Sequence, residues 1–311
     1  MIDFKIPAEQ IIEGRSRVNA KFLAETLFVV PKNDGEAVRA VEVLEALGAP
    51  HLRVSKQAWG ATLEREGLPA KLPDGVKRVV VFEIPSIHEE KALREKGLEV
   101  VIIDHHFYKD VDRRRDDSSL EQLAAMLNWP MSKVDMAIAV NDRGYIPGMI
   151  AMGLSKQEIR DVRLYDTVAQ GRTPDWVADM IRISQEDIPT FKVEAGVTII
   201  DRPIADEGIL KQELALRTVD GIAHSLIINS GRVSFSGDPR VVKSLLETNF
   251  ENLGYAPGSY SQYGGGDAKA SMFFGFNPKT APQNAKELIP LGIQRRIREI
   301  VRQARLEGGH Q

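Results

Sequence analysis

Short apolar runs alternate with segments of helical spacing through the first half of the chain. The runs at residues 26–30 (TLFVV), 78–84 (RVVVFEI) and 99–103 (EVVII) consist almost entirely of Val, Ile, Leu and Phe. Between them, residues 36–47 carry apolar side chains at helical intervals, and residues 88–96 are predicted to form a short charged helix. Buried strands separated by helices are typical of a parallel sheet that is covered on both faces. The pattern therefore predicts a doubly wound α/β domain, in which ligands bind at the carboxyl ends of the strands.

Helical periodicity dominates the middle of the chain, and strand-like runs return only after a short polar stretch. Residues 184–190 (SQEDIPT) form that stretch, and their polarity and proline favour a linker. We therefore predict two domains, a first one at residues 1–186 and a second one at residues 187–311. Helices are predicted at residues 118–140 (with a break at Trp129 and Pro130), 155–170 and 174–183.

The second domain is predicted to be a smaller α/β domain. A glycine-rich segment at residues 263–276 and a charged helix that begins near Ile293 close the chain. Strands are predicted at residues 196–200, 222–229 and 232–236, and a helix is predicted at residues 239–247.

Composition narrows the class of protein. The 311 residues are 43% hydrophobic and 27% charged, which is ordinary for globular domains and sufficient for two cores. The net charge of −3 provides no basic surplus, so we expect no extended duplex nucleic acid as a partner. The absence of cysteine excludes disulfides, thiolate metal sites and cysteine nucleophiles. No window approaches about 18 apolar residues, so we expect no membrane partner and a cytoplasmic location.

The strongest chemical signal is Asp104-His105-His106, which directly follows the predicted strand at residues 99–103. Side chains at the carboxyl end of a buried parallel strand project into the ligand cleft of an α/β domain. A carboxylate with imidazoles suits a hard or borderline divalent cation such as Mn²⁺. A solvated turn with two incidental histidines is the alternative. The chain has only six histidines, so an adjacent pair at this place favours the metal site.

Carboxylates also follow three other apolar segments. Asp34 and Glu36 come after the run at residues 26–30, Glu83 ends the next run, and Asp142 follows the apolar segment AIAV. Each of them alone is better explained as a helix cap or a surface carboxylate. Together with the histidine pair they favour a metal cluster, because closely spaced carboxylates repel one another and a divalent cation offsets that repulsion.

These motifs resemble those of the DHH phosphoesterase superfamily, and the resemblance extends over roughly residues 24–276. By this resemblance, Asp34 and Glu36 stand for the D-x-D pair, Glu83 for the second motif, and Asp142 for the fourth. The resemblance implies catalytic roles for Asp104, His105, His106 and Asp142. It also implies that one or two Mn²⁺ ions, or none if the site has lost its function, are held by Asp34, Glu36, Glu83, Asp104, His105 and Asp142.

The glycine-rich segment carries a second resemblance. YGGGDAKAS, at residues 263–271, is similar to the G-G-G-H-x-x-A-x-G signature of the DHH-associated C-terminal domain. Glycines let backbone N–H groups approach an anion closely. Arg143, beside Asp142, is a further candidate for a phosphate contact, whereas Arg113-Arg114-Arg115 is predicted to be a solvated charged loop. The expected substrate-binding residues are His106, Arg143, Gly264, Gly265, Gly266, Asp267 and Lys269.

The resemblance implies a Mn²⁺-dependent phosphohydrolase, a phosphodiesterase or phosphatase, that acts on a small nucleotide or short oligonucleotide and could form a homodimer. A non-catalytic homologue that binds a nucleotide or a protein partner is the alternative. It is motivated by departures from the family pattern: Val30 replaces a metal-binding histidine, Glu36 and Glu83 replace Asp, and Asp267 replaces His. A family II-type pyrophosphatase is a third possibility, disfavoured because no basic motif of the expected type lies near the C-terminus.

Overall fold

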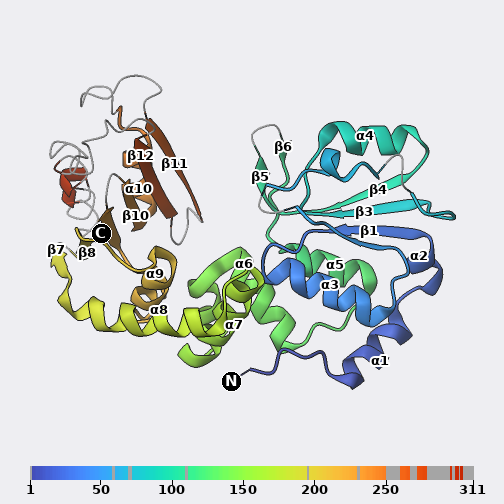
Figure 1. Cartoon of the computed structure of the whole chain (residues 1–311), viewed down its shortest axis with the longest axis horizontal. Coiled ribbons are helices and arrows are strands. Elements are labelled where there is room, and N and C mark those ends of the chain that lie inside the picture. Colours follow the sequence, from blue (N-terminus) through green and yellow to red (C-terminus); the bar gives the residue numbers. More distant parts are fainter. Residues whose placement is uncertain are drawn as a thin grey trace. The chain divides into compact units, whose positions relative to one another are not determined.

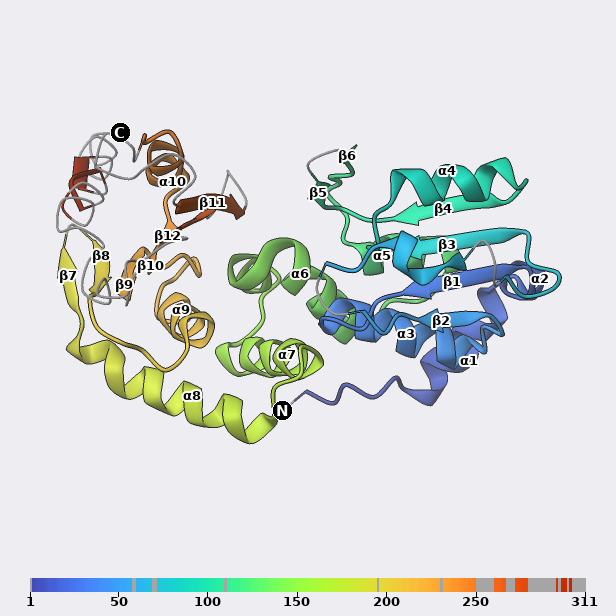
Figure 2. The ribbon, with the colours of Figure 1, turned by 45° about the horizontal axis from the view of Figure 1, so that its top comes forward.

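The computed structural model describes most of the chain as two compact units, Met1–Pro174 and Asp175–Gln311. Figures 1 and 2 show the helices and strands of each unit. The described residues are 2–57, 60–68, 72–108, 111–194, 196–229, 232–249, 260–266, 272–278, 295, 298–300, 302 and 303.

The first unit is built on a parallel sheet with the strand order β2-β1-β3-β4. Each neighbouring pair is parallel, so the carboxyl ends of all four strands lie at one edge of the sheet. The predicted doubly wound α/β fold is therefore confirmed. The strands are β1 (Thr26–Val30), β2 (Leu52–Val54), β3 (Arg78–Phe82) and β4 (Glu99–Ile103).

Helices cover both faces of this sheet (Figure 1). Side chains of β1 and β3 alternate between the faces, as the two-residue period of a strand requires. Phe28 and Val80 lie in one core cluster together with Leu44 of α3 (Gly35–Leu47). Val81 lies in the opposite cluster together with Leu93 of α4 (Ile87–Glu95). The remaining elements of the unit are α1 (Ala8–Arg17), α2 (Ala20–Ala24), η1 (Leu63–Glu66), β5 (Phe107–Tyr108), β6 (Val111–Asp112), α5 (Ser119–Leu127), α6 (Lys133–Ala151) and α7 (Lys156–Ala169).

Three helices of the first unit begin at serines. Ser118, Ser132 and Ser155 each accept a hydrogen bond from the backbone N–H three residues later, and the carboxylate at that later position bonds back to the serine N–H. Such capping boxes satisfy N–H groups that have no partner inside the helix. The predicted break at Trp129 and Pro130 is confirmed, since α5 ends at Leu127 and α6 begins at Lys133.

The predicted linker at residues 184–190 is wrong. α8 (Pro174–Asp187) continues through its first half, and a short 3₁₀ helix, η3 (Ile188–Thr190), takes up the rest. The polar residues are used in packing: Ser184 is buried, and Gln185 donates a 2.9 Å hydrogen bond to Glu213. The contacts of the chain divide it into the two units after Pro174, whereas the domain boundary after residue 186 stays a prediction.

The second unit contains a mixed sheet with the strand order β11-β12-β10-β9-β8-β7, in which only the β8–β9 pair is parallel. One of its core clusters joins Phe235 and Phe274 of the sheet to Val241 and Leu245 of α10 (Pro239–Leu246). No helix among the described residues has both the length and the apolar character needed to cross a membrane. The other elements are β7 (Lys192–Glu194), β8 (Val197–Ile200), α9 (Glu207–Ala215), β9 (Ser225–Asn229), β10 (Arg232–Gly237), β11 (Tyr260–Gly266) and β12 (Met272–Pro278).

Candidate metal centre

Four side chains meet where the carboxyl ends of β3 and β4 approach α3 and α6. Glu36, Glu83, His105 and Asp142 each offer one donor atom, and these four atoms all lie within 4.8 Å of one another. His105 Nε2 lies 2.6 Å from Asp142 Oδ2, 3.4 Å from Glu83 Oε1 and 3.9 Å from Glu36 Oε2. We refer to these residues as the four-residue cluster. It lies at the edge of the sheet where doubly wound proteins bind their ligands.

A backbone hydrogen bond helps to position each of Glu36 and Glu83. Glu36 lies in the first turn of α3, and its Oε1 accepts a 2.8 Å hydrogen bond from Leu120 N, which leaves Oε2 for the cluster. Glu83 follows β3 with a φ of 51°, a left-handed conformation that costs a non-glycine residue about 1–3 kcal/mol. Its backbone N–H donates a 2.9 Å hydrogen bond to Ile103 O, so the pairing of the sheet extends up to Glu83.

Asp142 reaches the cluster from the middle of α6, where the sequence suggested the end of an apolar segment. The helical path is interrupted three residues later, at Tyr145, which has a φ of 49° and a ψ of −146°. Pro147 accounts for the interruption, because it has no N–H to donate to the carbonyl four residues earlier. The kink lies directly after the turn that carries Asp142.

The four atoms that the cluster could offer to a cation are buried, and they have no hydrogen-bond partner among the described residues. These atoms are Glu36 Oε2, Glu83 Oε1, His105 Nε2 and Asp142 Oδ2. The 2.6 Å contact between His105 and Asp142 is thus an ion-pair approach without hydrogen-bond alignment. Buried polar atoms are nearly always satisfied in proteins, so four such atoms that converge at one point fit the coordination of a cation. Three carboxylate oxygens and one imidazole nitrogen suit a divalent cation such as Mn²⁺ or Zn²⁺.

The protonation equilibria reflect an excess of buried negative charge. Burial, together with the charges of Asp142 and Glu83, raises the pKa of Glu36 well above its ordinary value. Burial lowers the pKa of His105, but its contacts with Asp142 and Glu83 outweigh burial and raise this pKa to about 10. In Asp142, burial favours the neutral acid, yet the neighbouring His105 holds the pKa below its ordinary value. A divalent cation at this point would replace protons as the source of positive charge.

His106 lies at the rim of the cluster, with its side chain 45% exposed. Its Nδ1 lies 3.7 Å from Glu83 Oε1, and Glu83, His105 and His106 form a second group of donors within 4.8 Å. The same Nδ1 lies 3.1 Å from Asp104 Oδ1. This contact with Asp104 outweighs burial and raises the pKa of His106. His106 is therefore oriented by a carboxylate on one side and open to solvent on the other.

Asp104 and Asp34 were expected as metal ligands, but neither belongs to the four-residue cluster. Asp104 Oδ1 accepts hydrogen bonds from the backbone N–H of His106 at 3.0 Å and from the Tyr108 hydroxyl at 3.3 Å. Asp34 caps α3 by accepting a 2.8 Å hydrogen bond from Ala37 N. Burial first, and the charge of Glu83 second, raise the pKa of Asp34 to about 7. Asp34 thus supports the start of α3, which carries Glu36, and Asp104 supports the segment that carries His105 and His106.

The predicted solvated loop at residues 113–115 is wrong for its first arginine. The Arg113 side chain is 11% exposed, contacts Glu90 of α4 and lies 3.5 Å from Asp104 Oδ2. Two buried carboxylates need a cation, and Arg113 supplies it. Arg143, expected to contact a phosphate, donates hydrogen bonds of 2.8 and 3.3 Å to Glu121. Its side chain is 36% exposed, and a substrate contact stays a prediction.

The residues expected to bind substrate in the second unit lie partly outside the described residues. Gly264, Gly265 and Gly266 belong to β11, which is an edge strand and pairs with β12. The segment is therefore one arm of a hairpin up to Gly266. Asp267 and Lys269 fall outside the described residues, as does most of the helix expected beyond Ile293.

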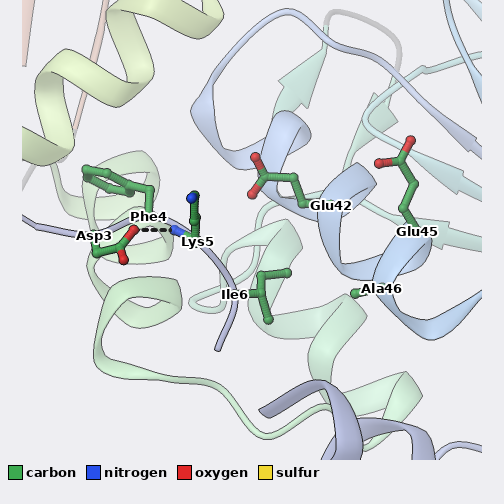
Figure 3. A pocket seen from close by; sticks show the side chains of 7 residues that line it. All are labelled: Asp3, Phe4, Lys5, Ile6, Glu42, Glu45 and Ala46. Atoms are coloured by element: carbon green, nitrogen blue, oxygen red, sulfur yellow. Dashed lines mark hydrogen bonds between the residues drawn. The ribbon is translucent and has the colours of Figure 1, made fainter. Parts of the chain in front are cut away.

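Two cavities, one in each unit, are lined by residues outside the four-residue cluster. Figure 3 shows one of about 600 Å³ in the first unit, where the N-terminal segment passes α3. It is lined by Asp3, Phe4, Lys5, Ile6, Glu42, Glu45 and Ala46, with mostly acidic charges. A second one, of about 250 Å³, lies beside β8 and α9 in the second unit.

Comparison with known proteins finds no matching family model and no matching curated protein. Among solved structures, the chain is similar to a manganese-bound exonuclease RecJ, at 14% identity, a TM-score of 0.41 and 96% coverage of both chains. It is also similar to RecJ from Thermus thermophilus in complex with Mn²⁺ (13% identity, TM-score 0.42) and with Mg²⁺ (13%, 0.40). It covers 55% and 53% of those two chains, about half their length.

Proposed function

We propose that this protein is a divalent-cation-dependent phosphohydrolase, with the cation held by Glu36, Glu83, His105 and Asp142. The observation that carries the proposal is the convergence of four buried, unsatisfied donor atoms at the carboxyl edge of a parallel sheet. The resemblance of Asp104-His105-His106 to the D-H-H motif supports a phosphoester as the substrate and Mn²⁺ as the cation.

The residues of the site would have two roles, to bind the cation and to orient a proton donor toward the substrate. A bound divalent cation would lower the pKa of water and offset the charge of a phosphoester. Glu36, Glu83 and Asp142 would anchor that cation, while neutral His105 would offer Nε2. His106 turns Nδ1 toward Asp104, so its Nε2 would be left to donate a proton to a substrate oxygen. The raised pKa of His106 favours the protonated imidazole that this role needs.

The proposed substrate is a small nucleotide or a short oligonucleotide. A net charge of −3 offers no continuous basic surface for a long nucleic acid backbone. Arg143 on α6 and the glycines of β11 are proposed to contact the substrate, together with Asp267 and Lys269. Pyrophosphate, the substrate of the third possibility, belongs in the same set of assays.

Hydrolysis of bis(p-nitrophenyl) phosphate, dinucleotides and pyrophosphate, with and without Mn²⁺, tests the proposal. Asp142→Asn and His105→Gln should each lower the Mn²⁺-dependent rate by more than the 10- to 100-fold typical for the loss of an outer-shell partner. Lys133→Met is the matched control on α6, since its ion pair with Glu158 is exposed. Undiminished Mn²⁺-dependent turnover in both variants would refute the assignment.

One observation favours a second candidate, a non-catalytic protein that binds a nucleotide or a protein partner. Asp34 and Asp104 are engaged by Ala37 N, His106 and Tyr108, so the cluster has four donors where the family resemblance implied six. This candidate predicts that nucleotides bind without turnover. Equilibrium dialysis with labelled nucleotides, run beside the hydrolysis assays, separates the two functions.

A further inference from the structure

Two residues of the four-residue cluster, Glu36 of α3 and Asp142 of α6, lie on helices that both pack against α7. Glu36 directly follows Gly35 in α3, and Asp142 directly follows Asn141 in α6. Gly35 N donates a 2.9 Å hydrogen bond to Asp166 Oδ1 of α7. Arg163, one turn earlier on α7, donates to Asn141 Oδ1 at 3.2 Å.

Arg163 and Asp166 are also bonded to each other. Arg163 Nη1 lies 2.6 Å from Asp166 Oδ2, so one ion pair connects the residue before Glu36 with the residue before Asp142. The side chains of Arg163 and Asp166 are only 16% and 10% exposed. At such burial, solvent screens the pair weakly and removal of one partner is costly.

The contact between α3 and α7 is tight at Gly35. A Cβ atom at Gly35 would lie 3.0 Å from Asp166 Cα and 3.2 Å from Tyr165 Cδ1. The two backbones therefore approach as closely as a glycine permits. The first turn of α3, which carries Glu36, is fixed against the segment of α7 that carries Asp166.

The contact between α6 and α7 coincides with backbone strain. Tyr145 adopts a φ of 49° and a ψ of −146°, and the Arg163 guanidinium lies 4.7 Å from the centroid of its ring. Strained residues persist only where the surroundings hold them. Arg163 thus contacts α6 on both sides of Asp142, at Asn141 and at Tyr145.

We propose that Arg163 and Asp166 are positioning residues that set the separation between Glu36 and Asp142, and thereby the affinity of the four-residue cluster for a divalent cation. The inference rests on the proposed cation site. Neither residue belongs to the cluster, and both act through Gly35, Asn141 and Tyr145. Without the ion pair, α3 and α6 are no longer bonded to the same point on α7, and the distance between Glu36 and Asp142 is less closely fixed.

Mn²⁺ titration, followed by the electron paramagnetic resonance of free Mn²⁺, measures this role in the full chain. Arg163→Met, which keeps the apolar stem, should raise the Mn²⁺ Kd by about 10- to 100-fold, as for other outer-shell partners. Asp166→Asn keeps an acceptor for the Gly35 N–H, so its Kd for Mn²⁺ should rise less than that of Arg163→Met. Arg163→Lys keeps the positive charge but lacks the planar guanidinium with its several N–H donors, so it should bind Mn²⁺ with intermediate affinity.

A matched control separates positioning from general loss of stability. Lys133→Met removes the 2.8 Å ion pair with Glu158, which joins the same two helices, α6 and α7, at an exposed place. This variant should keep the wild-type Kd. Circular dichroism melting of the metal-free proteins verifies that every variant is folded at the titration temperature; if Arg163→Met is not, Asp166→Asn and Arg163→Lys carry the test.

The possible outcomes are distinct. Wild-type affinity in all of the folded Arg163 and Asp166 variants would overturn the positioning role and leave the cation site intact. An equal loss in Lys133→Met would also overturn it, since the effect would then be general. Absence of Mn²⁺ binding by the wild type would overturn the proposed function, and this inference with it.

Discussion

Buried carboxylates determine the chemistry of this protein at the scale of single residues. Glu36 is 2% exposed, and its Oε2 finds no hydrogen-bond donor among the described residues. A charge buried without a partner is costly, so it neutralises by binding a proton or pairs with a cation. The proton and the divalent cation should therefore compete for the same cluster.

This competition predicts that the metal-free protein becomes less stable as the pH rises. The pKa of Asp34 is raised from 3.8 to about 7, and that of Glu36 is raised as well. The folded state holds these protons more tightly than the unfolded state, so their stabilising contribution is full at low pH and is lost as the pH rises, for Asp34 between about pH 4 and pH 7. His105, raised from 6.5 to about 10, adds a contribution of the same sign that is lost between those values. The free energy of unfolding should therefore fall from pH 5 to pH 8.

Urea denaturation in EDTA at pH 5 and pH 8 measures this slope. Glu36→Gln should flatten it, because the amide is neutral at both pH values, and saturating Mn²⁺ should reverse it. A metal-free wild type that is more stable at pH 8 than at pH 5 would contradict the description of the cluster.

The buried ion pair between Arg39 and Asp135 is predicted to be needed for the stability of the first unit. Arg39 and Asp135 are both fully buried and lie 2.6 Å apart, and Asp135 also accepts hydrogen bonds from Gln10 and Trp129. Asp135→Ala leaves the guanidinium without its main partner and should cost about 3–5 kcal/mol in chemical denaturation. The exposed pair of Lys133 is the comparison: Lys133→Met should cost less than about 1 kcal/mol. Similar losses in the two variants would refute this role of Asp135.

At the scale of elements, the contact between α3 and α7 predicts the effect of a single methyl group. Gly35→Ala places a Cβ atom 3.0 Å from a backbone atom of α7, so α3 must shift. We expect a loss of about 1–3 kcal/mol and weaker Mn²⁺ binding, because Glu36 moves with the helix. Gly144→Ala in α6 is the control, since a Cβ there meets no atom within 4 Å. Denaturation and Mn²⁺ titration of both variants check the prediction; equal behaviour would contradict it.

The sequence predicted those elements whose periodicity is strong. The strands at residues 26–30 and 99–103 were predicted to the residue, because near-continuous apolar runs have few alternative explanations. β2 and β7 were missed, since they are three residues long and carry no buried side chain. Asp142 was placed just beyond the helix predicted to end at residue 140, whereas α6 continues past it to Ala151.

The sequence also predicted the members of the four-residue cluster but not the direction of every carboxylate. Asp34 and Asp104 occupy the expected places, and their side chains turn toward Ala37 N and the His106 backbone N–H. Such choices depend on donors that only the folded chain brings near. Arg163 and Asp166 had no signal at all, because a polar pair at helical spacing is typical of a solvated face.

At the scale of the whole molecule, the cluster belongs to one of two compact units. Its four residues all lie within Met1–Pro174. A ligand at 100 times its Kd stabilises the folded state by about 2.7 kcal/mol, which is about 5–10 °C for a unit of this size. Calorimetry with Mn²⁺ should therefore show two transitions, of which one shifts and the other stays. Equal shifts in both transitions would contradict the confinement of the site to the first unit.

Anomalous X-ray scattering at the manganese edge from crystals soaked in Mn²⁺ locates a bound cation directly. We predict a peak within bonding distance of Glu36 Oε2, Glu83 Oε1, His105 Nε2 and Asp142 Oδ2. The peak should disappear in crystals of Asp142→Asn. Manganese bound only elsewhere, or no peak at these four atoms at saturating Mn²⁺, would contradict the claim that they form a cation site.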